Sequence, residues 1–179
     1  MKTAVLVFSP QGGELAARYF SSYDLYGKSF GNNVSKEKFK GIFRKYDRIV
    51  FIGAMGIAVR YLVPVLRDKR EDPAVAVIDP SGRYVISVLS GHLGGANDFT
   101  VELAKKIGAV PVITTASDHL GYTSIDLFAK ENHYVIADMK RMKEVAAAMV
   151  AGEPVYFYSE KKPRPDYSHL VEAKSAEEA

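Results

Sequence analysis

The residues whose types and spacing best suit chemistry lie in a glycine-rich stretch at positions 90–98, Ser-Gly-His-Leu-Gly-Gly-Ala-Asn-Asp. An apolar run at residues 84–89 precedes it and predicts a buried strand. The segment that follows, residues 98–107, has apolar residues at every fourth position, which predicts a helix. Asn97 or Asp98 can cap this helix. A loop between a strand and a helix N-terminus can bind an anion, because free amides and the helix dipole point towards the ligand.

His92 is the titratable side chain at the centre of this loop. An imidazole can act as a general base or acid near neutral pH, or donate a hydrogen bond to a developing oxyanion. Its glycine neighbours argue against a core histidine, although loop histidines without a function are common. The four histidines of the chain lack the spacing of metal ligands, so no protein-bound metal site is predicted.

Two further loops, at residues 53–56 and 114–118, are also predicted at the carboxyl ends of strands, where open α/β sheets usually bind ligands. The alternative is that their glycines only let a helix pack closely on its strand and their hydroxyls only cap a turn. The candidate substrate-binding residues of the three loops are Gly53, Gly56, Ser90, Gly91, Asn97, Thr114, Thr115 and Asp118.

The segment after the first of these loops combines an apolar helix with a basic cluster. Residues 57–66 are nearly all apolar, which predicts a buried helix. Arg60 and Arg67 fall on roughly one side of it, and Lys69 and Arg70 follow. A buried arginine needs a partner, because an unpaired buried charge is costly. That partner is either an internal carboxylate or a substrate carboxylate held in bidentate fashion.

The elements that must position these loops follow an alternating order. Apolar runs alternate with helical patterns, which is typical of an α/β fold with a mainly parallel, doubly wound sheet and helices on both faces. Asp-Pro-Ser-Gly at residues 79–82 is a turn signal, so Ala74–Ile78 and Tyr84–Leu89 are predicted to form an antiparallel hairpin. The other predicted strands are residues 4–8, 23–26, 48–52, 109–113, 134–136 and 155–158, and the predicted helices are residues 14–20, 36–46, 57–66, 98–107, 124–132 and 140–151.

Composition limits the class of protein. The chain has 179 residues, of which 47% are hydrophobic and 25% charged, the usual mix of a globular protein. Its net charge of +3 is too small to indicate nucleic-acid binding, and the absence of cysteine excludes disulfides and thiolate chemistry. The N-terminal apolar run is too short for a signal peptide or a membrane span, so a cytoplasmic protein is expected. Residues 1–158 are predicted to form the α/β region, and the charged, proline-interrupted residues 159–179 a linker or tail.

Four motifs occur in a specific order along the chain: Gly53-Ala54-Met55-Gly56-Ile57-Ala58-Val59-Arg60, Asp72-Pro73-Ala74-Val75, Leu89-Ser90-Gly91-His92-Leu93-Gly94-Gly95-Ala96-Asn97 and Pro111-Val112-Ile113-Thr114-Thr115-Ala116-Ser117-Asp118. This series resembles the cobalt-precorrin-5A hydrolase family, the G protein of the anaerobic cobalamin pathway. The resemblance covers the N-terminal and middle parts of the family, to about Tyr158. Family members usually carry a further C-terminal domain, which is expected to be absent here.

The resemblance implies an activity. Family members open the lactone of cobalt-precorrin-5A and release acetaldehyde, which gives cobalt-precorrin-5B. We hypothesise that His92 is the base or acid, and that the amides of Gly94 and Gly95 stabilise the oxyanion. The cations that would hold the peripheral carboxylates are Arg60, Lys69 and Arg70. No separate cofactor is expected, because the cobalt arrives inside the substrate.

The resemblance also leaves alternatives. One is a non-catalytic tetrapyrrole-binding module that needs a separate chain carrying the C-terminal domain, and another is a nucleotide- or phosphate-binding α/β protein. The expected partners are the cobalt-corrinoid intermediate and either such a chain or a second copy of this one. Neither nucleic acid nor a membrane is expected.

Overall fold

The computed structural model describes residues 1–68, 71–92, 94–115, 121–160 and 164–178. They form two compact units, Met1–Ile113 and Thr114–Ala179.

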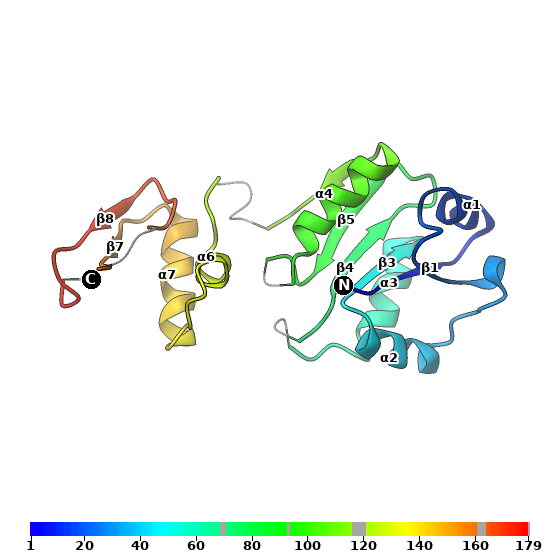
Figure 1. The fold of residues 1–179 in the computed structure, drawn as a ribbon, viewed down its shortest axis with the longest axis horizontal. Helices are drawn as coiled ribbons and strands as arrows, with labels where there is room; N and C mark the ends of the chain where they lie inside the picture. Colours follow the sequence, from blue (N-terminus) through cyan, green and yellow to red (C-terminus); the bar gives the residue numbers. More distant parts are fainter. Residues whose placement is uncertain (69–70, 93, 116–120, 161–163, 179) are drawn as a thin grey trace. The chain divides into compact units, whose positions relative to one another are not determined.

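The first unit is an α/β sheet with helices on both faces (Figure 1). Its elements in chain order are β1 (Thr3–Val7), α1 (Pro10–Tyr19), β2 (Asp24–Tyr26), the 3-10 turn η1 (Lys28–Phe30), α2 (Lys36–Lys45), β3 (Arg48–Ile52), α3 (Met55–Leu62), β4 (Ala74–Ile78), β5 (Tyr84–Leu89), α4 (Ala96–Ile107) and β6 (Val110–Val112). The sheet order among the described residues is β2-β1-β3-β4-β5-β6. The predicted doubly wound, mainly parallel α/β fold is therefore confirmed.

The strand directions confirm the predicted hairpin. The pairs β2–β1, β1–β3 and β3–β4 are parallel, β4–β5 is antiparallel, and β6 runs parallel to β5. The strands β1, β3 and β4 therefore end at one end of the sheet, which we call the carboxyl end. The strands β5 and β6 end at the opposite one, the amino end.

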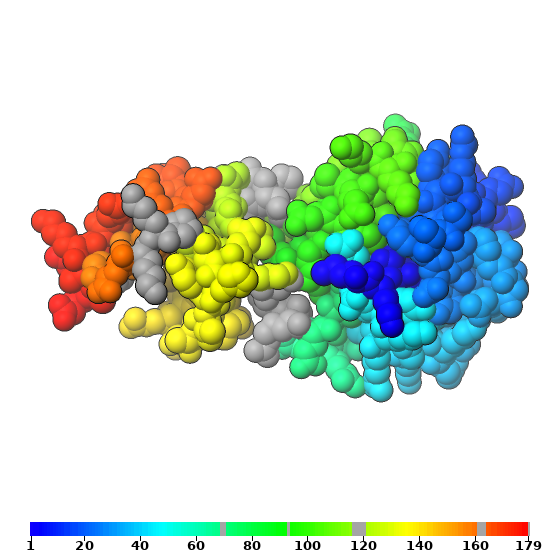
Figure 2. All heavy atoms as spheres, in the orientation of Figure 1, coloured from blue at the N-terminus to red at the C-terminus, as the bar shows by residue number. Residues whose placement is uncertain are grey.

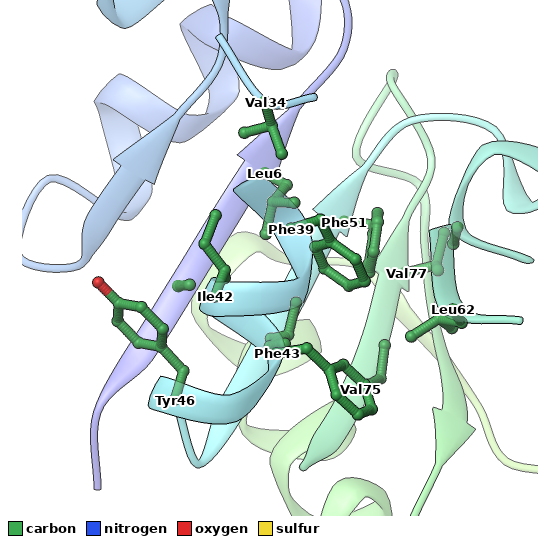
Figure 3. Close-up of a cluster of buried hydrophobic side chains, with 13 residues drawn as sticks. Leu6, Val34, Phe39, Ile42, Phe43, Tyr46, Phe51, Leu62, Val75 and Val77 are labelled. Carbon is green, nitrogen blue, oxygen red and sulfur yellow. The ribbon is translucent and has the colours of Figure 1, made fainter. Parts of the chain in front are cut away.

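Two hydrophobic layers hold the helices on the sheet. Alternate residues of a strand point to opposite faces, so Leu6 joins a layer with α2 and α3 while Val7 joins a layer with α1 and α4. Figure 3 shows the first layer, where the Phe39 and Phe51 rings lie together with centroids 5.5 Å apart. The first residues of the chain, dark blue in Figure 2, stand on the surface, and burial begins at Thr3.

The helix α3 differs from its prediction. It ends at Leu62 rather than residue 66, and only Ala58 and Leu62 of its residues are fully buried. Val59 and Val63, four residues apart, are 45% and 65% exposed. The predicted buried helix over residues 57–66 is therefore wrong, since one face of α3 packs on the sheet and the other faces solvent. Pro64 cannot donate a backbone hydrogen bond, which explains the early end.

The second unit contains α6 (Ile125–Glu131), α7 (Met139–Ala151), β7 (Val155–Phe157) and β8 (Leu170–Glu172). Asp138 caps α7 by accepting hydrogen bonds from the amides of Lys140 and Arg141. The predicted strand at residues 134–136 is not formed, and Val135 is 92% exposed.

The predicted linker or tail at residues 159–179 also differs from the structure. The strand β8 lies in this segment and pairs in parallel with β7. Just before β8, the buried Tyr167 donates its hydroxyl to the Glu153 carbonyl at 2.7 Å. An aromatic anchor therefore holds this charged, proline-containing segment to the rest of its unit.

Candidate functional site

Because β5 runs antiparallel to β4, the loops after β3 and β5 lie at different ends of the sheet. The loop after β3 lies at the carboxyl end of the sheet, where the Gly53 amide donates to the Ile78 carbonyl at 2.9 Å. The loop after β5 lies at the amino end, where the Ser90 hydroxyl donates to the Asp72 carbonyl, just before β4, at 2.9 Å. These two glycine loops therefore lie at opposite ends of the sheet.

The glycines of the loop at residues 53–56 are not close to other backbone. A Cβ added at Gly53 would make ordinary contact with the Phe8 ring at 3.4 Å, and one at Gly56 would meet open space. Neither glycine is needed for a close approach of α3 to its strand. Arg60 and Arg67 are exposed, so the predicted need for a buried partner does not arise.

The loop between β5 and α4 is closed by its own backbone. The amides of Ala96 and Asn97 donate to the carbonyls of Ser90 and Gly91, both at 3.1 Å, and the Gly95 amide donates to the His92 carbonyl at 3.0 Å. These three amides at the start of α4 are therefore already engaged. The predicted anion site built from free amides at this helix start does not exist in that form.

The buried Asn97 side chain stabilises the loop through a hydrogen bond with Ser87. Its side chain is 6% exposed, and its Oδ1 accepts a hydrogen bond from the Ser87 hydroxyl at 2.7 Å. A Cβ at Gly91 would meet that same Oδ1 at 2.9 Å, so a glycine is needed there. The predicted cap by Asn97 or Asp98 is wrong: α4 begins at Ala96, after Gly95, whose φ is +76°. The Asn97 side-chain oxygen therefore has a structural role.

Ser90 and Gly94 form the tightest contact in the loop. Ser90 has a φ of +60°, a conformation that costs a non-glycine residue energy. A Cβ added at Gly94 would lie 2.4 Å from the Ser90 Cβ and 2.8 Å from the Ser90 carbonyl oxygen. The hydrogen bond from the Ser90 hydroxyl to Asp72 helps to hold this conformation. His92 lies two residues after Ser90, so it follows directly on this constrained segment of backbone.

The turn before β4 meets this loop. The Asp72 side chain is 8% exposed, and its carboxylate accepts the Arg67 amide at 3.1 and 3.3 Å. The Asp72 amide in turn donates to the Asp68 carbonyl at 2.9 Å. From the sequence, Asp72 is the first residue of one of the four motifs and one of the internal carboxylates that could pair with an arginine. An aspartate before a proline, which favours a local turn, was the available signal.

Sequence reasoning also missed Arg48, the first residue of β3 at the amino end of the sheet. Its guanidinium carbon lies 4.6 Å from the centre of the Phe99 ring, and its Nη1 lies 3.3 Å from the Glu102 carboxylate. Both partners belong to α4, so Arg48 fixes the helix that follows the His92 loop. The signal was a single cation at the start of an otherwise apolar strand.

Other predicted residues cannot be placed in this site. Lys69, Arg70 and Asp118 lie outside the described residues. Thr114 and Thr115 begin the second unit, so their predicted role stays a prediction. Among the described residues, no group of three histidine, cysteine or acidic side chains could hold a metal ion. None of the described helices has the length and apolar character needed to cross a membrane.

Two family models match the sequence. The model described as "Cobalamin synthesis G N-terminal" matches residues 37–118, and the model described as "Cobalamin biosynthesis central region" matches residues 123–179. The first match contains α3, the Asp72 turn and the His92 loop.

Known proteins are similar to this chain over one or both of these regions. A cobalt-precorrin-5A hydrolase from Priestia megaterium is 37% identical over 95% of this chain and 50% of its own length. Another from Salmonella typhimurium is 46% identical over 63% of this chain and 32% of its own length. A crystal structure of a cobalamin biosynthesis protein G homologue from Sulfolobus solfataricus has a TM-score of 0.54 and 25% identity, and the match covers 95% of this chain and 52% of that one. This chain spans half or less of these curated relatives.

Proposed function

This chain belongs to the cobalamin biosynthesis G protein family, and we propose that it acts in corrin-ring biosynthesis as a cobalt-precorrin-5A hydrolase. The observation that carries this proposal is the similarity, over 95% of the chain, to a protein named for that activity. The proposed reaction opens the substrate lactone and releases acetaldehyde, which gives cobalt-precorrin-5B. We place it in the cytoplasm, with the cobalt inside the substrate and no separate cofactor.

The chemistry needs a group that moves protons and a donor for an oxyanion. Water adds to the lactone carbonyl, the ring C–O bond breaks, and a carboxylic acid and a free hydroxyl result. Loss of the hydroxyl proton then allows carbon–carbon cleavage: the hydroxyl-bearing carbon leaves as acetaldehyde and the macrocycle takes up a proton. In this proposal the His92 imidazole accepts the proton of the attacking water and returns it later. The bracing of its loop by Asp72 and Asn97 supports this role, since a catalytic group must be held in place.

The amides of Gly94 and Gly95 are the candidate oxyanion donors. The Gly95 amide already donates to the His92 carbonyl, so it would have to give up that bond to stabilise an oxyanion. We therefore retain the Gly94 amide as the proposed donor. Arg60 is exposed and thus available to a carboxylate of the substrate, and Lys69 and Arg70 remain proposed for the same task.

The test is to supply cobalt-precorrin-5A to this chain and to measure acetaldehyde. A His92→Ala variant should turn over roughly a hundredfold more slowly or worse, which is the usual contribution of a general acid or base, while substrate binding changes little. The matched control is His133→Asn, because His133 is exposed and has a φ of +57°, which asparagine tolerates.

Three results would count against parts of the proposal. Turnover of His92→Ala at the wild-type rate would remove His92 from the mechanism. Binding of the corrinoid without acetaldehyde release would instead indicate a binding module that needs a partner chain. Tighter binding of nucleotides than of the corrinoid would overturn the proposed substrate class.

A further inference from the structure

A cavity of about 240 Å³ lies at the carboxyl end of the sheet, away from the His92 loop. One wall is the segment directly after β1, with Phe8 and Ser9, and the other is the segment after β2, with Lys28, Ser29 and Asn33. These residues precede the first family match, which begins at residue 37. The cavity is seen in the structure of this chain, and a ligand site there does not depend on the proposed hydrolase activity.

Its position suits ligand binding. The strand β1 has β2 on one side and β3 on the other. The order in which the chain adds strands to the sheet therefore reverses at β1. The helix that leads to β2 lies on one face and the helix that leads to β3 on the other (Figure 1). Open α/β sheets bind ligands at the carboxyl ends of the strands where the order reverses in this way.

The walls of the cavity are brought together by glycines. A Cβ added at Gly13 in α1 would lie 2.6 Å from the Ser29 hydroxyl oxygen. Gly27 has a φ of +149°, and a Cβ there would lie 2.6 Å from the Val7 carbonyl oxygen. A side chain at Gly13 would push Ser29 away from α1, and one at Gly27 would push the segment before Lys28 away from β1, so the close approach depends on both glycines.

The polar side chains that line the cavity include several hydrogen-bond donors. Ser9 Oγ accepts the Gly12 amide at 3.1 Å, which leaves its own hydroxyl proton to donate. Ser29 adds a second hydroxyl, Asn33 an amide group and Lys28 an ammonium group. Of the lining residues that the structure describes, one is a cation and none carries a carboxylate. Two hydroxyls and one ammonium group match the oxygen atoms and the single charge of a carboxylate.

We propose that this cavity binds a carboxylate group, with the Lys28 ammonium as its counter-ion and the Phe8 side as an apolar wall. The volume is below the range for drug-sized ligands, so the group belongs either to a small free carboxylic acid or to one carboxylate arm of a larger molecule. A doubly charged phosphate fits less well, because the described lining supplies only one cation.

The test is calorimetric titration of the full chain with succinate, with inorganic phosphate and with a cobalt-corrinoid that carries carboxylate arms. The Lys28→Gln variant should bind the carboxylate ligand at least about tenfold more weakly, because it loses a charge-assisted hydrogen bond. Ser29→Ala should weaken binding by a smaller factor. The matched control is Lys40→Gln, an exposed lysine on α2 that does not line the cavity. Circular dichroism checks that each variant is folded.

The ligands separate the two sources of the carboxylate. Succinate binding that depends on Lys28 indicates a free acid, whereas binding of the corrinoid alone with the same dependence indicates one arm of a larger ligand. The proposal is overturned if neither carboxylate binds, if Lys28→Gln binds as tightly as the wild type, or if phosphate binds in preference. These titrations measure ligand binding and not acetaldehyde release. Failure of this proposal can therefore be distinguished from failure of the hydrolase proposal.

Discussion

Replacing Gly94 by alanine tests whether the His92 loop is as tightly closed as its geometry indicates. The new Cβ would lie 2.4 Å from the Ser90 Cβ, over 1 Å inside the optimal carbon–carbon distance of about 3.5 Å. It would also lie 2.8 Å from the Ser90 carbonyl oxygen, which is backbone and cannot rotate away. The loop must therefore move, and overpacking of this kind typically costs about 1–3 kcal/mol.

A second effect has the opposite sign. Alanine restricts the unfolded chain more than glycine does, which stabilises the folded state by about 0.4–1 kcal/mol. Gly94→Ala should therefore lower the free energy of unfolding by a net ~0–2.6 kcal/mol. Gly41→Ala is the control for this effect, because Gly41 lies within α2 and a Cβ there meets nothing within 4 Å. That variant should be more stable than the wild type by about 0.5–1 kcal/mol.

The assay is urea unfolding of both variants, followed by far-ultraviolet circular dichroism and by tyrosine fluorescence, since the chain has 11 tyrosines and no tryptophan. If Gly94→Ala matches Gly41→Ala in stability, the close contact between Gly94 and Ser90 is not present in solution. The reasoning that this loop is rigid would then be refuted.

Three further changes test other parts of the first unit. Phe39→Ala should cost about 3–5 kcal/mol in urea unfolding, because the ring is fully buried; a cost below about 1 kcal/mol would contradict the packing in Figure 3. Tyr46→Phe removes the hydroxyl that donates to Asp24 at 2.7 Å and should cost about 1 kcal/mol, whereas unchanged stability would show that this bond contributes nothing. Burial alone would raise the pKa of Asp79, but hydrogen bonds from the Ser81 hydroxyl and from backbone amides outweigh it and lower that pKa. Because the pKa is lowered, the ionised carboxylate stabilises the folded state above the unfolded value of about 4, and this stabilisation is lost as the pH falls through the folded pKa. Asp79→Asn should therefore destabilise more at pH 7 than in acid; an equal effect at both would refute this.

The central strands could be predicted from the sequence because their signals are local. The bounds of β3, β4 and β5 agree with the prediction, since each is an apolar run between polar or turn-forming residues. The turn signal at residues 79–82 also predicted the hairpin, which the register confirms. The loops do follow the strands as predicted, but the loop after β5 lies at the other end of the sheet because β5 is antiparallel to β4, a consequence of the predicted hairpin itself.

Other errors depended on contacts that a single sequence does not reveal. The apolar composition of α3 indicated full burial, but Val59 and Val63 face solvent because only one side of the helix reaches the sheet. The contact of Asn97 with Ser87 could not be foreseen, since it joins a helix to a strand ten residues away. In the second unit, the charged residues and prolines after residue 158 predicted a linker or tail. The sequence did not show that the buried Tyr167 holds this segment to the rest of its unit.

The hairpin of β4 and β5 also bears on how the first unit folds. In the first unit these are the sheet neighbours joined by a short turn, residues 79–83, whereas the other pairs of that sheet are separated by segments that contain a helix. Contacts that are close in sequence form fast, and an isolated hairpin forms in about 1–10 μs. We expect the hairpin to be present in the folding transition state, before β1 pairs with β3. Changes in the turn should then slow folding, while changes in β1 should mainly speed unfolding.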